Sequence, residues 1–316
     1  MKKDRFIIHQ IIFISVSFLF WFYLLGPKFI SPLNQSWLYN GDLPIYQIGW
    51  NFFRNDIWRF PFGLNPNYGI YSGGSIVFSD SIPLLAFTFK IFKKLIPETF
   101  QYFSFWILLC IYLQIYLSYK IIFHYSENFF YSLISSFFFL TSTIFILRSG
   151  IHLSLMGHWL ILLYYYINIS AKINFKENKK KFLILFSSLI HFYFTIILII
   201  IYFLEAILNL RFTKNNVVKF FLGNFVFFIF LILLMYIVGY FSINLDDGLG
   251  SGYGFFNFNL NSFFNPQGEN TISSFSWSFF LNEINFYNGN IEGFSYLGLS
   301  GFFFIILYFL NLITDK

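Results

Sequence analysis

Long apolar segments separated by short polar stretches make up most of the chain. A helix that crosses the hydrocarbon core of a bilayer needs about 20 residues. The segments that reach or approach this length are Phe6–Leu25, Phe100–Phe123, Phe129–Leu147, Leu153–Ile169, Phe182–Leu210, Val217–Phe241 and Tyr296–Ile313. The pattern predicts an all-α protein, a polytopic transmembrane helical bundle formed by residues 1–316 as a single domain.

Two polar interruptions are much longer than the others and predict two large extracytoplasmic loops, at about 31–98 and 242–294. In the first, Pro44–Trp58 has the apolar and aromatic spacing of a helix that lies in the membrane interface. Gly63–Gly74 is rich in turn-forming residues and is expected to be coil. The segment Ile82–Ile96 is apolar but short and contains three lysines, so it predicts a juxtamembrane helix or a short span.

The segment Phe182–Leu210 has about 29 residues, too many for one upright span and too few for two. Its polar interruption is His191-Phe192-Tyr193, near the middle. We therefore expect a short helical pair that turns around His191.

Composition supports a membrane protein. Of 316 residues 57% are hydrophobic and only 11% are charged, with a mean hydropathy of +0.66. Soluble domains carry about 25% charged residues, so this chain has too few to cover a water-facing surface. The single cysteine, Cys110, excludes an intrachain disulfide.

The net charge of +6 comes from lysines and arginines in short runs between apolar segments. This distribution is typical of cytoplasmic loops of the inner membrane and gives no indication of nucleic-acid binding. The runs at Lys2–Arg5 and Lys172–Lys181 predict a cytoplasmic N-terminus, an uncleaved first span and a location in the bacterial inner membrane, with membrane lipid as a partner. The same orientation requires that Ile82–Ile96 does not span.

Ionisable residues near the predicted outer face are candidates for chemistry, because charged groups at membrane depth are costly. Asp42 precedes the interfacial helix and is compatible with either a helix cap or a catalytic carboxylate. Asp80, in Ser79-Asp80-Ser81-Ile82-Pro83, fits an N-cap better. Glu292, before the last span, could cap it or reach a site shared with Asp42.

Arg148, His152 and His158 flank an elbow between two predicted spans. They suggest an anion clamp, with Arg148 on a phosphate and His152 on a phosphate oxygen or sugar hydroxyl; the alternative is a water-satisfied interfacial cluster. His152 and His158 are six residues apart, a poor spacing for a helical metal pair, so no metal site is predicted. His191 has the same two interpretations, ligand or core histidine.

Trp50 and Arg54 of the first outer loop are candidate sugar- and phosphate-binding residues, because aromatic rings stack on sugar faces. P-loop, GxGxxG, GxSxG and HExxH motifs of soluble enzymes do not occur. Any catalytic site must therefore be assembled from the loops and elbows.

Several short segments together resemble the C-type (GT-C) membrane glycosyltransferase superfamily, and in particular an uncharacterised bacterial integral-membrane family of that architecture. They are Gly41-Asp42, Gln47–Arg54, Trp58–Asn65, Ser79–Leu84, Arg148–Trp159, His191–Tyr193 and Glu292–Gly298. The resemblance covers most of the chain, although each segment is short.

The resemblance implies that Asp42 acts as general base on an acceptor or holds a divalent cation, Mg or Mn. It implies a polyprenyl-phosphate sugar donor, a glycan, lipid or protein acceptor, and transfer on the outer face. The chain departs from the superfamily at the elbow, where Arg148 and His152 stand in place of a second acidic residue, which favours a metal-independent mechanism. The resemblance also implies that part of the C-terminal region of typical members is missing from this chain.

The sequence thus predicts a membrane glycosyltransferase with Asp42 as the catalytic residue. Two alternatives stay open: a transporter or flippase for a lipid-linked or polar solute, and a non-catalytic membrane assembly subunit. A transporter would be expected to show paired inverted repeats and interrupted helices, and the sequence shows no internal repeat.

Overall fold

The computed structural model describes residues 2–68, 74–170, 173–209, 214–242, 260–266, 278, 280–281 and 295–314. In these ranges the regular structure is helical, and the only β-type pairing is an isolated bridge between Leu64 and Ser75. The α-helices are α1 (Lys2–Leu25), α2 (Pro44–Asn55), α3 (Pro83–Ile91), α4 (Phe103–Ser126), α5 (Phe129–Leu140), α6 (Thr143–Arg148), α7 (Trp159–Ser170), α8 (Ile173–Ser187), α9 (Phe192–Asn209), α10 (Lys214–Val238) and α11 (Gly298–Thr314). Short 3₁₀ helices include η3 (Ile76–Ser79) and η4 (Leu153–Met156).

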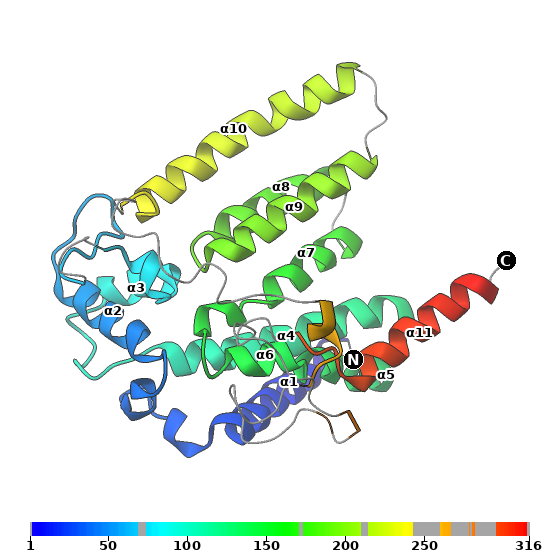
Figure 1. Cartoon of the computed structure of the whole chain (residues 1–316), viewed down its shortest axis with the longest axis horizontal. Helices are drawn as coiled ribbons and strands as arrows, with labels where there is room; N and C mark the ends of the chain where they lie inside the picture. Colours follow the sequence, from blue (N-terminus) through cyan, green and yellow to red (C-terminus); the bar gives the residue numbers. More distant parts are fainter. Residues whose placement is uncertain are drawn as a thin grey trace.

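The helices form a bundle around α4, which packs against α1, α5 and α7 (Figure 1). The pair α8 and α9 packs on α7, and α10 lies along α8. The short helices α2 and α3 sit together at one end of the bundle, on the left in Figure 1. Half of the apolar stretch of α4 is buried, which places the centre of the core there.

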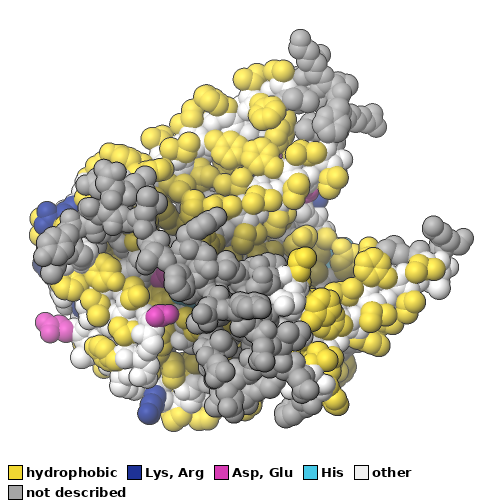
Figure 2. Space-filling model, in the orientation of Figure 1, with side chains coloured by type: hydrophobic (Ala, Val, Ile, Leu, Met, Phe, Trp, Pro, Cys, Tyr) yellow, Lys and Arg dark blue, Asp and Glu magenta, His cyan; other side chains and the backbone are white. Residues whose placement is uncertain are grey.

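Within the part of the chain that the structure describes, three helices are long and apolar enough to cross a membrane, at Ile7–Leu25, Phe103–Ser126 and Phe220–Val238. Hydrophobic side chains cover much of the visible face of the molecule (Figure 2). On α10, for example, Phe221, Leu222 and Phe225 are more than 60% exposed, which suits hydrocarbon and not water. The all-α prediction is confirmed for the described residues, and the chain has the apolar helices of a membrane protein.

Two predicted spans have different boundaries. The segment Phe129–Leu147 is broken at residues 141–142 into α5 and α6, and the segment Leu153–Ile169 begins with η4, so that α7 has only 12 residues. Serine and threonine at such breaks bond to the backbone and compete with the helix; the Thr141 hydroxyl donates to the carbonyl of Phe137.

The basic run between two predicted spans is helical from residue 173 to residue 181 and belongs to α8. Lysine and glutamate are good helix formers, and Lys180 pairs with Glu177 one turn away. The predicted turn at His191 is confirmed, because α8 ends at Ser187 and α9 begins at Phe192.

The segment Ile82–Ile96 contains α3, whose nine residues are about 14 Å long and too short to span a bilayer. The loop before it is held against α10. Phe62 N–H donates to the carbonyl of Ile237, and a Cβ on Gly63 would lie 1.8 Å from the carbonyl oxygen of Val238. This close approach brings the first loop next to the end of α10. The predicted second outer loop lies mostly outside the described residues.

Candidate functional site

Asp80 occupies an unusual backbone position between η3 and α3. Its φ is +51°, a left-handed conformation that aspartate tolerates, and Ile82 two residues on has φ +48°, which is strained for a β-branched residue. Ser81 between them is tied down on both sides: its hydroxyl donates to the carbonyl of Tyr46 at 2.9 Å, and its own carbonyl accepts from the hydroxyl of Tyr102. Strain held in this way is typical of functional sites.

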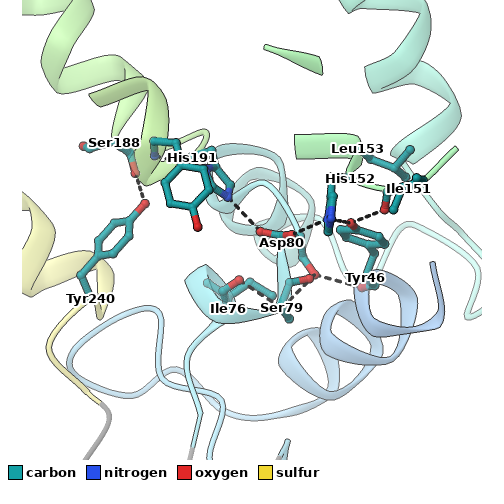
Figure 3. A network of polar contacts seen from close by, with 12 residues as sticks. Tyr46, Ile76, Ser79, Asp80, Ile151, His152, Leu153, Ser188, His191 and Tyr240 are labelled. Carbon is teal, nitrogen blue, oxygen red and sulfur yellow. Dashed lines mark hydrogen bonds and ion pairs between the residues drawn. The ribbon is translucent and has the colours of Figure 1, made fainter. Parts of the chain in front are cut away.

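The carboxylate of Asp80 lies between two imidazoles that come from separate connections of the bundle (Figure 3). His191, in the turn between α8 and α9, places Nε2 at 3.1 Å from Oδ1. His152, in the connection between α6 and α7, places Nδ1 at 3.6 Å from Oδ2. All three side chains are partly shielded, with 13–28% of their surface exposed. Along the sequence, Asp80 is 72 positions from His152 and 111 positions from His191.

Burial by itself raises the pKa of Asp80, but the contacts to His152 and His191 outweigh it, so the pKa lies well below its usual range. The carboxylate is therefore ionised at neutral pH. Its interaction with the two rings is an electrostatic link between the first loop and two helix connections.

The hydrogen bonds define which ring nitrogens carry a proton. Nδ1 of His191 accepts from the N–H of Tyr193 at 3.1 Å, so its Nε2 carries the hydrogen that points to Asp80. The hydroxyl of Tyr46 donates to the carbonyl of Ile151 at 2.6 Å, so its oxygen accepts from Nδ1–H of His152 at 3.2 Å. In neutral His152 the lone pair is then on Nε2, the nitrogen a general base would use.

Tyr46 connects this site to two further predicted residues. Burial raises the pKa of its hydroxyl, the charges of Asp80 and Asp42 raise it further, and the charge of Arg148 acts in the opposite direction. Asp42 and Arg148 therefore both lie within electrostatic range of the Tyr46 hydroxyl. Asp42 is exposed, and Arg148 is half-buried at the end of α6.

Two tyrosines that sequence reasoning missed also lie near Asp80. The pKa of each is raised, first by burial and then by the charge of Asp80, at Tyr68 in the first loop and at Tyr240 after α10. Tyr240 donates to the carbonyl of Ser188 at 2.7 Å and so joins α10 to the turn that carries His191. Among 22 tyrosines, nothing in the sequence distinguishes these two.

The N-cap interpretation of Asp80 is wrong. The cap position of α3 is Ile82, and no side chain caps this helix. The same holds for α2, whose cap position is Leu43, so Asp42 is no cap either. Both helices begin with a proline at their first turn, which supplies a pre-set φ and leaves one fewer N–H to satisfy.

Three predicted site residues lie outside the Asp80 cluster, with their side chains engaged in the fold. The indole of Trp50 is fully buried and donates to the carbonyl of Phe100. The His158 ring lies 5.9 Å from the rings of both Phe145 and Phe194. Arg54 is 3% exposed, and its guanidinium donates to the three backbone carbonyls of residues 96–98. Glu292 lies outside the described residues.

The contacts of Arg54 predict a structural role that can be measured. Arg54→Lys is expected to lower the free energy of unfolding by about 2 kcal/mol or more, because a single ammonium cannot reach three carbonyls and leaves buried acceptors unpaired. Thermal unfolding in detergent measures this loss. Arg59→Lys, at an arginine five residues away that is 41% exposed and pairs with Asp56, is the control and should lose clearly less stability. An unchanged melting temperature for Arg54→Lys would contradict the structural role.

The described residues contain no group of three or more His, Cys, Asp and Glu side chains arranged to hold a metal ion. The protonation of the rings in the Asp80 cluster also disfavours a metal ion there. Both ring nitrogens facing the carboxylate carry hydrogens in the assignment above, whereas a metal needs their lone pairs. A divalent cation stays a prediction from the resemblance alone.

The depressed pKa of Asp80 predicts a pH dependence of stability. A carboxylate whose pKa is lower in the folded than in the unfolded state stabilises the fold above its unfolded pKa of about 3.9 and loses that contribution as the pH falls further. The melting temperature should therefore fall more steeply for wild type than for Asp80→Asn as the pH drops below about 4. Parallel curves would contradict the two imidazole contacts.

A second polar cluster, which sequence reasoning missed, lies about 20 Å along α9 from His191. Lys180 of α8 is 2% exposed and contacts Glu205 of α9 at 2.8 Å and Glu177 at 3.1 Å. The other oxygen of Glu205 accepts from Tyr164 and Asn168 of α7. The cluster borders a cavity of about 330 Å³ between α8, α9 and α10. It joins three helices through one buried ammonium group.

Comparison with known proteins identifies the family. Residues 14–316 match the family described as a domain of unknown function (DUF6311), and since this is most of the chain, the protein belongs to that family. No curated protein and no solved structure matches significantly. The family description carries no activity, so function is argued from the site.

Proposed function

We infer that this protein is a membrane glycosyltransferase that moves a sugar from a polyprenyl-phosphate donor to an acceptor at the extracytoplasmic face. The observation that supports this best is the Asp80 carboxylate held between His152 and His191. A carboxylate that fixes the proton-bearing nitrogen of an imidazole is a common arrangement for general-base catalysis. The acceptor would be a hydroxyl of a glycan, a lipid or a protein side chain.

The position of the site supports an outer location. His191 lies at the α8–α9 turn, at the end of the bundle that carries α2 and α3 (Figure 1). The basic run of α8 begins at the other end of that helix. If lysine-rich ends are cytoplasmic, as the charge rule predicts, the Asp80 cluster is extracytoplasmic. A lipid-linked donor could reach such a site from the outer leaflet.

The chain's own residues suggest a single inverting displacement. Nε2 of His152 takes the proton of the acceptor hydroxyl while Tyr46 accepts from Nδ1–H, and the Asp80 carboxylate, 3.6 Å from Nδ1, stabilises the positive charge that forms on the ring. The acceptor oxygen forms a bond to the anomeric carbon, and the bond from that carbon to the phosphate oxygen breaks with its electron pair on the phosphate. Arg148 stabilises the negative charge of the departing phosphate. The proton on His152 then passes to that phosphate or to water.

Asp42 takes a different place in this proposal from the one that the resemblance implies. Its carboxylate is exposed, and it lies at the edge of the site beyond Tyr46. General-base catalysis depends on a fixed geometry, which favours the His152–Asp80 pair over an unsupported carboxylate. We assign Asp42 to the binding of the acceptor.

Transfer itself is the test. Purified protein in proteoliposomes, given polyprenyl-phosphate sugars labelled in the sugar, should transfer label to an acceptor fraction extracted from the envelope of the source cells. The matched control is the Asp80→Asn protein, which should leave the label on the donor. Equal labelling with both proteins, or none with wild type across a panel of hexosyl and pentosyl donors, would overturn the proposal.

One observation favours the alternative of a transporter. The buried Lys180–Glu205 ion pair lies toward the opposite end of α8 and α9 from the turn that contains His191, and buried charges among membrane helices often mark solute pathways. A transporter would accumulate solute in sealed vesicles without transferring label. Uptake that the double variant Lys180→Met, Glu205→Leu abolishes, with no sugar transfer, would establish this alternative.

Tyr46 is expected to act as a positioning residue, because its hydroxyl receives the hydrogen bond from Nδ1–H of His152. Tyr46→Phe should lower kcat roughly tenfold with little change in KM, since the ring still fills its place but His152 loses one of its two orienting contacts. Tyr112→Phe, at a half-buried tyrosine of α4 whose hydroxyl donates to Gln10 of α1, is the comparison for a structural effect. Equal kcat losses in the two variants would contradict the positioning role.

A further inference from the structure

A groove of about 660 Å³ runs between α7 and α8, away from the Asp80 cluster. Its walls come from one face of each helix: Leu163 and Ile167 on α7, and Leu183 and Phe186 on α8. These positions repeat every three or four residues, so each helix presents an apolar stripe to the groove. Most of the surface of these walls is apolar, which suits an apolar occupant.

The two ends of the groove differ in polarity. Trp159, at the start of α7, lies at the end nearer the His152 connection, whereas Ser170, Asn178 and Lys179 line the other end. Lys179 is exposed and directly precedes the buried Lys180. This polar end coincides with the point at which α8 changes from lysine-rich to apolar sequence at Phe182. The groove therefore combines an apolar length with a positive charge at headgroup depth.

We propose that this groove binds one acyl chain of an anionic phospholipid of the cytoplasmic leaflet, with the phosphate group on Lys179. The charge of Lys179 complements a phosphate, and the direction of the groove matches a chain that enters from the basic end. A donor lipid bound for reaction would carry its phosphate at the Asp80 end instead.

The experiment uses the full-length protein in detergent and native mass spectrometry with dipalmitoyl phosphatidylglycerol and dipalmitoyl phosphatidylcholine. Wild type should retain one phosphatidylglycerol and bind it roughly fivefold more tightly than phosphatidylcholine. Lys179→Glu should remove this preference, because it reverses the charge at the headgroup. Leu163→Trp should weaken binding of both lipids, because the indole fills the apolar part of the groove.

Matched controls separate the groove from general effects. Lys94→Glu makes the same charge change after α3, and Leu222→Trp makes the same enlargement on the exposed face of α10; both should bind phosphatidylglycerol as wild type does. Far-ultraviolet circular dichroism and thermal unfolding check that each variant is folded. Equal retention of both lipids, or undiminished phosphatidylglycerol binding to Lys179→Glu, would overturn the proposal. It would also be overturned if an equal concentration of polyprenyl phosphate displaced phosphatidylglycerol, or if a second copy of the protein bound in place of the lipid.

Discussion

Replacement of His152 by Ala is expected to lower the transfer rate by roughly a thousandfold, within the range for loss of a positioned general base. The geometry gives the reason. Asp80 and Tyr46 both face Nδ1 of His152, which leaves Nε2 as the nitrogen with the lone pair. Added imidazole should restore part of the lost activity, because a small base can enter the space that the side chain leaves. Initial rates of labelled sugar transfer, with and without imidazole, measure both effects.

His158 provides the control for His152. It lies six residues along the chain, is also half-buried, and packs between Phe145 and Phe194. His158→Ala should keep the transfer rate within a few-fold of wild type and gain nothing from imidazole. A thousandfold loss in His158→Ala, or a His152→Ala protein with full activity, would contradict the assignment of the base.

Replacement of Lys180 by Met is expected to destabilise the protein by about 3–5 kcal/mol, the usual cost of leaving a buried charge without its partner. The side chain of Lys180 is 2% exposed, and the carboxylate of Glu205 would lose its closest cation. Tyr164 and Asn168 would still donate to Glu205 but cannot neutralise it. Unfolding in mixed micelles with increasing sodium dodecyl sulfate measures the change.

Two further variants isolate the charge pair. The double variant Lys180→Met, Glu205→Leu should recover most of the lost stability, because apolar replacement of a whole buried pair is often close to neutral. Lys179→Met, one residue earlier and exposed, should unfold as wild type does. Equal destabilisation by Lys179→Met and Lys180→Met would show that the buried contacts of Lys180 do not contribute to the free energy of unfolding.

Hydrophobic periodicity predicted the helices well but not their breaks. Apolar length alone indicates a helix such as α4, and the polar residues at His191 mark the turn between α8 and α9. The break between α5 and α6 follows from serine and threonine bonding to the backbone, which a count of apolar residues does not detect. The helix through the lysine run follows from helix-forming lysine and glutamate residues and from the Lys180–Glu177 pair one turn apart. The contact of Lys180 with Glu205, 25 positions away, is the part that local sequence does not contain.

The sequence identified several residues of the candidate site but did not predict how they contact one another. Asp80, His152 and His191 all stood out as ionisable groups in an apolar chain, and the structure brings these three together. Asp80 resembled a helix cap because Ser-Asp-Ser before Ile-Pro is a typical N-terminal signal. The left-handed backbone at Asp80, fixed by Tyr46 and Tyr102, turns the carboxylate away from the helix, and these contacts are long-range.

The comparison of two carboxylate variants tests the central claim most directly. Asp80→Asn and Asp42→Asn are assayed side by side for transfer of label from the polyprenyl-phosphate donor, at matched amounts of folded protein. If the His152–Asp80 pair is the base, Asp80→Asn loses roughly a thousandfold in kcat, whereas Asp42→Asn stays within about tenfold and changes mainly KM. Full transfer by Asp80→Asn together with none by Asp42→Asn would contradict it.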